Sequence, residues 1–197
     1  MLQELTLNAT KRETGKHISR QLRASGKIPG IFYSKADAPV NISVDSRDIR
    51  PIVYTSHLKL VNLNIEGEEK KCILKDVKFD PVTDNIVHFD LLGILDDRKI
   101  TVEVPVEFTG GQPIGVRKGG KFQQVFHKCK ITCLPKHLIS ALQVDISTLD
   151  VGGAIHLKDL DFEGVEYSLP LDSLLCAVNT PRGGKLGEGT SEQEQQS

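Results

Sequence analysis

Aromatic side chains are scarce in this chain of 197 residues, which has no tryptophan and only 5% aromatic residues. Any hydrophobic core must therefore be built mainly from aliphatic side chains. The sequence also lacks a run of 18 apolar residues, and its first residues lack the long apolar segment of a signal peptide. These absences predict a cytoplasmic protein with no membrane-spanning helix and no membrane partner.

Cysteine is too rare and too scattered for a disulfide framework, with four residues at Cys72, Cys129, Cys133 and Cys176. The segment HKCKITCLPKH adds His127 and His137 to two of them, which raises the question of a zinc site. In the alternating strand that this segment predicts, Cys129 and Cys133 lie about 13 Å apart. One ion cannot bind both at that separation. We therefore expect reduced, buried cysteines, with no metal and no cofactor.

Charge is nearly balanced overall, at a formal net charge of −1, but it is unevenly distributed. Residues 11–35 contain seven basic residues against Glu13 alone. Residues 137–178 contain seven acidic residues against Lys158 alone. This distribution predicts a basic patch near the N-terminus and an acidic lobe in the second half.

Short runs with period-2 alternation, such as LVNLNIEG, ITVEVPVEF and KCKITCL, predict a mainly β protein with short helices. KCILKDVKFD and NIVHFDLLG are expected to be two strands joined across DPVTDN. The charged segment Leu95–Lys99, which we call the hinge, separates two β-patterned halves. We expect domains at residues 1–95 and 99–180. The Gly-, Ser-, Glu- and Gln-rich residues 181–197 are expected to form a disordered tail.

The first clear helix lies in GKHISRQLRASGKIPGIFY, Gly15–Tyr33, which contains no acidic residue. Thr14 is expected to cap it, Gly26 to take a left-handed conformation after it, and Pro29 to stop it. A second short helix is expected from Asp45 or Ser46 through RDIRPIVYTS.

On a helical wheel, the basic side chains of the first helix gather on one side. Lys16, Arg20, Arg23 and, if the helix extends that far, Lys27 fall within about 60° of one another, opposite Ile18 and Leu22. Such a cationic stripe is suited to contact phosphates along a nucleic acid. A solvated helix face is the alternative. Tyr33 could stack on or hydrogen-bond to RNA, or it could be a strand residue half in the core.

Two features could indicate an enzyme. Gly115–Lys121 imitates a G-x-x-x-x-G-K phosphate loop, but Phe122 follows where Ser or Thr would hold magnesium, and the next residues read as strand. His88 and Asp90 point to the same face of a strand, yet no nucleophile accompanies them. We therefore expect no catalysis and no small-molecule substrate. A nucleotide-dependent enzyme using the Gly115–Lys121 loop is the alternative of a different class.

The order of GKHISRQLRASGKIPGIFY, KDVKFDP and VHFDLLG resembles the bacterial ribosomal protein family that binds 5S ribosomal RNA, and more narrowly its two-domain, general-stress (CTC) type. The resemblance extends to about Thr180 and includes PIGVRKGG in the second half. It implies an N-terminal RNA-binding β-barrel and a C-terminal β-rich domain. It also implies a structural protein of the large subunit, cytoplasmic and ribosome-associated, whose partners are 5S RNA and other large-subunit components.

Carried over by position, the resemblance implies RNA contacts for Lys11, Arg12, Lys16, Ser19, Arg20, Arg23, Tyr33, Lys78, His88 and Asp90. The chain departs from the family pattern at Gln21, where the family often has an arginine, and within KDVKFDP. There, Lys78 could supply a phosphate contact, whereas Asp80 would repel phosphate if it faced the RNA. Because similar barrels occur in anticodon-binding domains, a transfer-RNA or stress-related RNA-binding module outside the ribosome is the alternative.

Overall fold

The structure is a computed structural model that describes residues 3–55 and 57–180. It is mainly β with short helices, which confirms the predicted fold class. The expected disordered tail, residues 181–197, lies outside the described residues. In the part of the chain that is described, no helix is both long enough and apolar enough to cross a membrane.

The N-terminal half contains β1 (Glu4–Lys11), α1 (Lys16–Ala24), β2 (Lys27–Tyr33), β3 (Val40–Asp45), α2 (Ser46–Val53), β4 (Leu60–Ile65), β5 (Glu68–Phe79) and β6 (Ile86–Gly93). The C-terminal half contains β7 (Ile100–Thr109), α3 (Ile114–Arg117), β8 (Lys121–Gln124), β9 (Lys128–Cys133), η1 (Pro135–His137), β10 (Leu142–Asp145), β11 (Ala154–His156), η2 (Leu157–Asp159), β12 (Val165–Tyr167) and β13 (Leu174–Asn179).

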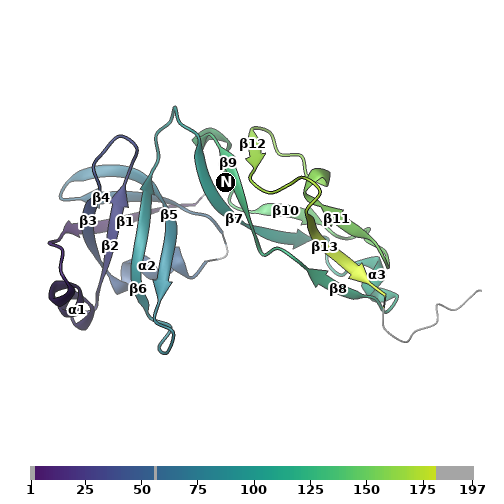
Figure 1. Cartoon of the computed structure of the whole chain (residues 1–197), viewed down its shortest axis with the longest axis horizontal. Helices are drawn as coiled ribbons and strands as arrows, with labels where there is room; N and C mark the ends of the chain where they lie inside the picture. Colours follow the sequence, from purple (N-terminus) through teal and green to yellow (C-terminus); the bar gives the residue numbers. More distant parts are fainter. Residues whose placement is uncertain (1–2, 56, 181–197) are drawn as a thin grey trace, which may run out of the picture.

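The strands of the N-terminal half close into a barrel in the order β1-β3-β2-β6-β5-β4 (Figure 1). Neighbours pair antiparallel except β1 with β4 and β2 with β6, which are parallel. Alternation in LVNLNI buries Val61, Leu63 and Ile65 on the inner side of β4. The two strands expected on either side of DPVTDN are β5 and β6, so that prediction is confirmed.

Helix α2 begins where the sequence predicts. The Oδ1 atom of Asp45 accepts a hydrogen bond from the Arg47 backbone N–H at 3.0 Å. Such a cap stabilises a helix by about 1 kcal/mol. Ile49 and Ile52 project from this helix into the barrel core, where both are buried. The helix is therefore fixed to the barrel by its apolar side.

Helix α1 differs from the expectation at its N-terminus. Its cap residue is Gly15, not Thr14, because the helical backbone starts one residue later than a Thr14 cap requires, and no side chain caps it. The predicted C-terminus is confirmed, since Gly26 has a φ of 79°, a conformation that glycine adopts without steric cost. Lys27 begins β2 and is not part of the helical stripe.

The C-terminal half contains a four-stranded sheet in the order β10-β7-β9-β12 and a three-stranded sheet in the order β11-β13-β8. Cys129 and Cys133 lie on the buried side of β9, and Cys176 is buried in β13. Cys72 is buried in the barrel, and all four thiols are free. The prediction that the cysteines serve as core residues is confirmed.

The two halves meet at an apolar junction. Ile73 of β5 is fully buried within the hydrophobic cluster of the C-terminal half, and Leu58 packs against the same cluster. The Leu58 backbone N–H also donates to the Ser140 carbonyl oxygen at 2.9 Å. The hinge lies between β6 and β7. We retain the domain boundaries at residues 95 and 99 as a proposal.

One position in the barrel interior requires glycine. A Cβ atom added to Gly30 of β2 would lie 2.4 Å from Cζ of Phe89. Phe89 is fully buried on the neighbouring strand β6 and is paired in register with Gly30. The Phe89 ring therefore occupies the space that any other side chain at position 30 would need.

We expect Gly30→Ala to lower the free energy of unfolding by about 1–3 kcal/mol, because an added methyl group overpacks a filled core. Chemical denaturation followed by circular dichroism measures this loss. As a control, the same change is made in a Phe89→Leu background, where the smaller side chain leaves room for the methyl group. If Gly30→Ala is equally costly in both backgrounds, the steric explanation is wrong.

Candidate nucleic-acid interface

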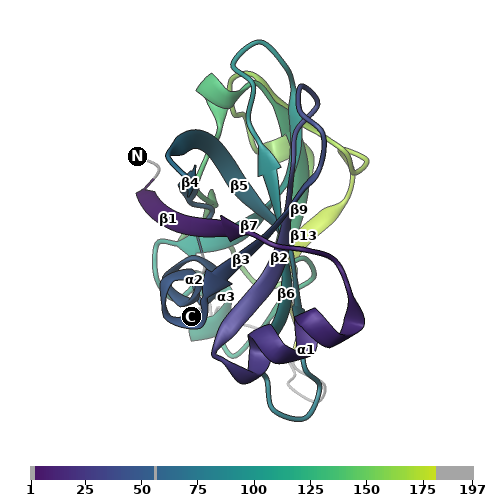
Figure 2. The same ribbon diagram turned by 90° about the vertical axis from the view of Figure 1, so that its left-hand side faces the viewer.

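Helix α1 lies against β2 on the outside of the barrel (Figure 2). Lys16, Arg20 and Arg23 are exposed, whereas Ile18 and Leu22 are half-buried. The two-sided helix that the wheel predicts is therefore present, although its apolar side is covered only in part. Among residues 3–55 and 57–180, these three cations have no ion-pair partner. Their charge is available to a ligand.

Two arginines are fixed against the barrel backbone. Arg23 donates from Nε to the Val87 carbonyl oxygen of β6 at 3.1 Å. Arg12 donates from Nε to the Ile42 carbonyl oxygen of β3 at 3.0 Å. Partial burial, and then the positive charge of Arg23, lower the pKa of Arg12. Both guanidinium groups are thus oriented by the barrel backbone, Arg12 by β3 and Arg23 by β6.

His88 and Asp90 form a pair on the outer face of β6, with 3.0 Å between Nδ1 and Oδ1. Partial burial lowers the pKa of His88, the charge and hydrogen bond of Asp90 act in the opposite direction, and the charges of Arg12 and Lys78 lower it further. The imidazole is therefore neutral at about pH 7. Its Nδ1–H donates to Asp90, which leaves a lone pair on Nε2 as a hydrogen-bond acceptor.

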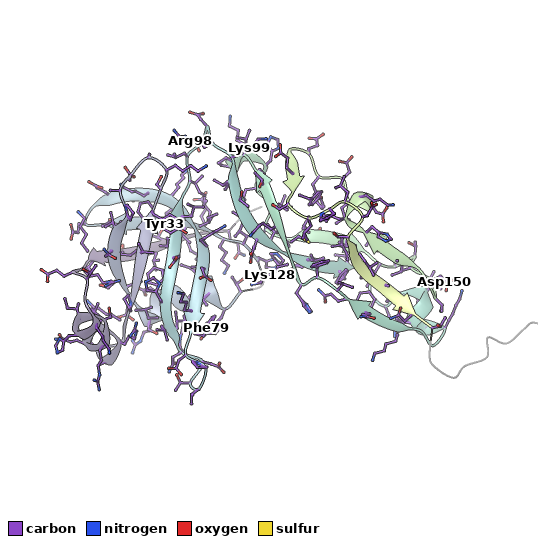
Figure 3. All side chains as sticks on the ribbon, viewed as in Figure 1. Tyr33, Phe79, Arg98, Lys99, Lys128 and Asp150 are labelled. Atoms are coloured by element: carbon purple, nitrogen blue, oxygen red, sulfur yellow. The ribbon has the colours of Figure 1, made fainter. Side chains whose placement is uncertain are left out.

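Tyr33 and Lys78 extend this face over the neighbouring strands. Tyr33 ends β2 and is half-buried, and burial followed by the charges of Asp90 and Asp76 raises its pKa, so the hydroxyl stays protonated. Lys78 is exposed on β5, opposite His88 in register. In Figure 3, Tyr33 lies above Phe79, which pairs with the start of β6. The polar face thus runs along the barrel over β2, β6 and β5.

The remaining residues implied by the resemblance are differently placed. The ammonium group of Lys11 lies 3.1 Å from Oε2 of Glu66, which follows β4. The hydroxyl of Ser19 donates to the Gly15 carbonyl oxygen at 2.9 Å and so serves the first turn of α1. Of the two basic residues before the helix, Lys11 is paired with a carboxylate, whereas the Arg12 guanidinium is held by the β3 backbone.

Asp80, the carboxylate that could oppose RNA binding, has a structural role in the loop between β5 and β6. Its Oδ1 atom accepts the backbone N–H groups of Val82 at 2.9 Å and Thr83 at 3.0 Å. These two hydrogen bonds lower the pKa of Asp80. The carboxylate therefore shapes the loop, as is typical of aspartate in turns.

Arg50 and Tyr54 are two residues that sequence reasoning missed. They belong to α2 and its C-terminal cap, and they line a cavity together with Arg23. The only available signal was the pair of basic residues, Arg47 and Arg50, in a short helix. That pattern could not show which of them faces another segment of the chain.

The second half offers no phosphate cradle at Gly115–Lys121. Strand β8 follows this turn, not a helix, and the Gly120 N–H donates to the Gly115 carbonyl oxygen at 2.8 Å. The ammonium group of Lys118 lies 2.6 Å from Oδ2 of Asp150. The Gly120 N–H is therefore engaged within the turn, and Lys118 is already paired with a carboxylate, so neither is available to a phosphate.

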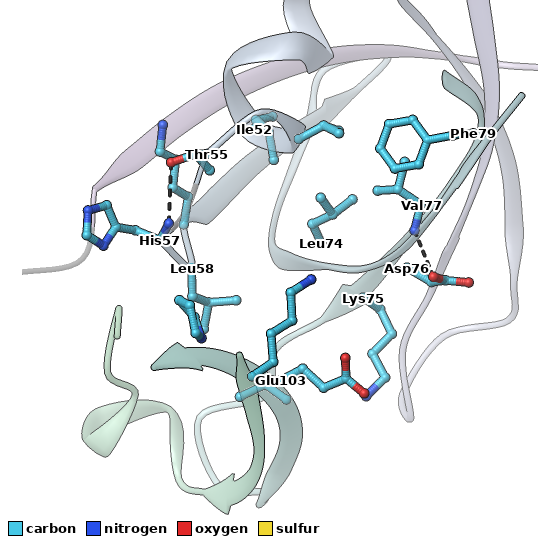
Figure 4. A pocket seen from close by; sticks show the side chains of 15 residues that line it. Ile52, Thr55, His57, Leu58, Leu74, Lys75, Asp76, Val77, Phe79 and Glu103 are labelled. Atoms are coloured by element: carbon cyan, nitrogen blue, oxygen red, sulfur yellow. Dashed lines mark hydrogen bonds between the residues drawn. The ribbon is translucent and has the colours of Figure 1, made fainter. Parts of the chain in front are cut away.

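A further cavity, of about 240 Å³, lies between α2, β5 and β7 (Figure 4). Ile52, Leu74 and Val77 contribute apolar side chains, and Lys75 and Glu103 contribute opposite charges. Lys59 and Lys128 also line it, and Asp76 adds a second carboxylate, so the cavity carries charges of both signs. Across residues 3–55 and 57–180, no group of three or more His, Cys, Asp or Glu side chains could hold a metal ion.

Comparison with known proteins gives two matches in sequence order. Residues 7–91 match the Ribosomal L25p family, and residues 99–182 match the family described as Ribosomal protein TL5, C-terminal domain. The large ribosomal subunit protein bL25 of Chloroherpeton thalassium is 37% identical over 177 residues, which cover 87% of this chain and 88% of the relative. The proteins of the same name from Porphyromonas gingivalis and Syntrophus aciditrophicus are 34% and 33% identical, covering 91% and 96% of this chain and 94% and 96% of the relatives.

We expect His88 to titrate below its ordinary pKa of 6.5 in an NMR titration of the imidazole signals. Asp90→Asn should lower the pKa further by removing a negative charge, and Lys78→Ala should raise it. Because the folded protein binds this proton less readily than the unfolded chain, the free energy of unfolding should fall as the pH drops below about 6.5. Asp96→Asn, in the hinge, is the control. If Asp90→Asn leaves the pKa of His88 unchanged, the two side chains do not interact as described.

Proposed function

The chain belongs to the ribosomal L25p family, and from this premise we propose that its N-terminal barrel binds 5S ribosomal RNA. The protein is a structural, non-enzymatic component of the large ribosomal subunit and is associated with the ribosome. The identity of the RNA as 5S ribosomal RNA is the proposed part. It is supported by the resemblance of the Gly15–Tyr33 segment to 5S-binding proteins and by the charge of the barrel face.

The observation that carries the proposal is a set of exposed cations without carboxylate partners on one side of the barrel. Arg20 and Arg23 project from α1, and Lys78 projects from β5. Within the described ranges, no carboxylate lies within ion-pair distance of these three side chains. Uncompensated charge of this kind is what a polyphosphate backbone neutralises on binding.

The shape of the face suits double-helical RNA. A-form RNA has a wide, shallow minor groove edged by phosphates and 2′-hydroxyl groups. Strands β2, β6 and β5 are adjacent in the barrel, and α1 lies beside β2 (Figure 2). In the proposed complex the strands face the groove and the arginines of α1 contact the phosphates. Arginine suits this role because its planar guanidinium can donate two parallel hydrogen bonds.

The His88–Asp90 pair supplies hydrogen bonding in place of charge. Neutral His88 presents Nε2 as an acceptor for a 2′-hydroxyl or a base amino group. Asp90 adds carboxylate oxygens that accept hydrogen bonds, and His88 holds it at 3.0 Å. The protonated hydroxyl of Tyr33 can donate to the RNA, and its ring can stack. These polar groups are proposed to make the interface selective, while the arginines supply most of the affinity.

The proposal assigns RNA binding to residues 1–95. Residues 99–180 carry the acidic lobe, whose carboxylates would repel phosphate. We propose that this half faces solvent or other large-subunit components.

We expect Arg20→Ala and Arg23→Ala each to weaken binding of the full chain to 5S RNA by several-fold to about tenfold, because each removes a phosphate contact. Fluorescence anisotropy over a series of salt concentrations measures the affinity. The slope of log affinity against log salt should also decrease by about 1 in each variant. Arg117→Ala in α3 is the matched control and should bind like the unmodified protein.

Transfer RNA at the same salt concentrations serves as the competing ligand. Equal affinity for transfer RNA and 5S RNA would favour a general RNA-binding module over the proposed function. Binding that does not change with salt would show that phosphate contacts do not drive the association.

A further inference from the structure

A cavity of about 370 Å³ opens at one end of the barrel, beyond the C-terminus of α1. It lies between the first residues of β2, helix α2 and the loop that joins β5 to β6. These elements meet at the lower end of the barrel in Figure 1. The volume falls within the range of small-ligand sites, roughly 300–1,000 Å³. The cavity borders the proposed RNA face because Arg23 belongs to both.

The lining of this cavity is strongly cationic. Arg23, Lys27 and Arg50 line it, and none has an ion-pair partner in the part of the chain that the structure describes. Its single carboxylate, Asp80, is engaged through Oδ1 by two backbone N–H groups. Arg23 is held by one hydrogen bond from Nε, which leaves its two terminal nitrogens to donate elsewhere. The chemistry favours an anion with several oxygens, such as a phosphate group.

An aromatic surface adjoins these cations. Tyr54 lines the cavity and remains 58% exposed, although its hydroxyl donates to the Asp84 carbonyl oxygen at 3.1 Å. Its ring is tilted by 54° against Phe79, at 6.2 Å between centroids, and Phe79 is itself 45% exposed. The ring of Tyr54 is thus held in place without being buried. An exposed, immobilised ring is a stacking platform for a base.

We propose that this cavity binds one unpaired nucleotide of the RNA that the barrel face holds. The phosphate contacts the guanidinium groups of Arg23 and Arg50, and the base stacks on Tyr54. Asn85, which also lines the cavity, offers an amide donor and acceptor for the base edge. The inference rests on the proposed function and extends it, because it adds a single-stranded subsite to a duplex-binding surface. RNA-binding proteins read sequence mainly from such unstacked bases.

The test compares Arg50→Ala and Tyr54→Ala with Arg47→Ala in the full chain, using 5S RNA as the probe. Arg47 is the matched control because it is an exposed arginine of the same helix that does not line the cavity. We expect each cavity variant to lose about tenfold in affinity, and Arg47→Ala less than twofold. The salt slope should decrease by about 1 in Arg50→Ala and stay unchanged in Tyr54→Ala, because stacking releases no counterions.

A second measurement locates the nucleotide. Acylation of 2′-hydroxyl groups should report one nucleotide whose reactivity changes on binding of the unmodified protein and of Arg47→Ala, but not on binding of Arg50→Ala or Tyr54→Ala. Tyr54→Phe keeps the ring and should bind like the unmodified protein, which separates stacking from loss of the hydroxyl.

The outcomes distinguish this inference from the function beneath it. If Arg20→Ala weakens binding but both cavity variants bind with unchanged affinity and footprint, the cavity holds no nucleotide and the proposed function stands. If Arg47→Ala and Arg50→Ala lose affinity equally, the effect is general charge and the subsite is refuted. If the unmodified protein does not bind 5S RNA, both proposals fail together.

Discussion

The packing of the Phe89 ring against Gly30 determines which side chains of β6 face outward from the barrel. β2 and β6 run parallel, with Gly30 opposite Phe89 and Ile31 opposite Asp90. Since side chains alternate along a strand, fixing Phe89 inside fixes His88 and Asp90 outside. A slip of one residue would turn that pair into the core, where unpaired charge is costly. The interior packing of two strands thus determines which polar groups the proposed RNA meets.

The arginine side chains of the outer barrel face are held in place without losing their positive charge. Arg12 and Arg23 donate to backbone carbonyl oxygens, which orient a guanidinium but leave its net charge intact. Lys11 shows the alternative, because its pairing with Glu66 offsets its charge. Arginines that are already oriented lose less conformational freedom when a phosphate arrives, and that saving appears as affinity. The carboxylate of Asp80 is likewise oriented by two backbone N–H groups, which lower its pKa, so it keeps its negative charge within the loop.

What the sequence predicts well is decided within a few residues of the chain. The left-handed Gly26, the cap of α2 by Asp45, and the strands on either side of DPVTDN depend on local backbone preferences and alternation. The Thr14 cap was wrong by one residue, which is the usual uncertainty at a helix end. The cavity beside Arg23 could not be predicted, because it joins segments from α1, α2 and the β5–β6 loop that only the closed barrel brings together. The same reason hid the hydrogen bonds of Arg12 to β3 and of Arg23 to β6, since no pattern within either segment reports contact with another strand.

The junction between the two halves restricts how the acidic lobe can move relative to the proposed RNA-binding face. Composition suggested a hinge at Leu95–Lys99, but contacts on either side of it restrict movement. Lys75 of β5 donates to the Thr101 carbonyl oxygen of β7 at 2.7 Å, and Ile73 is buried in the core of the other half. Swinging about the hinge would expose Ile73 to water, at a cost of about 1.5–3 kcal/mol for a fully buried aliphatic side chain. These contacts oppose a swing of the acidic residues 137–178 about the hinge, so in the proposed complex their repulsion of phosphate would limit where the RNA can lie.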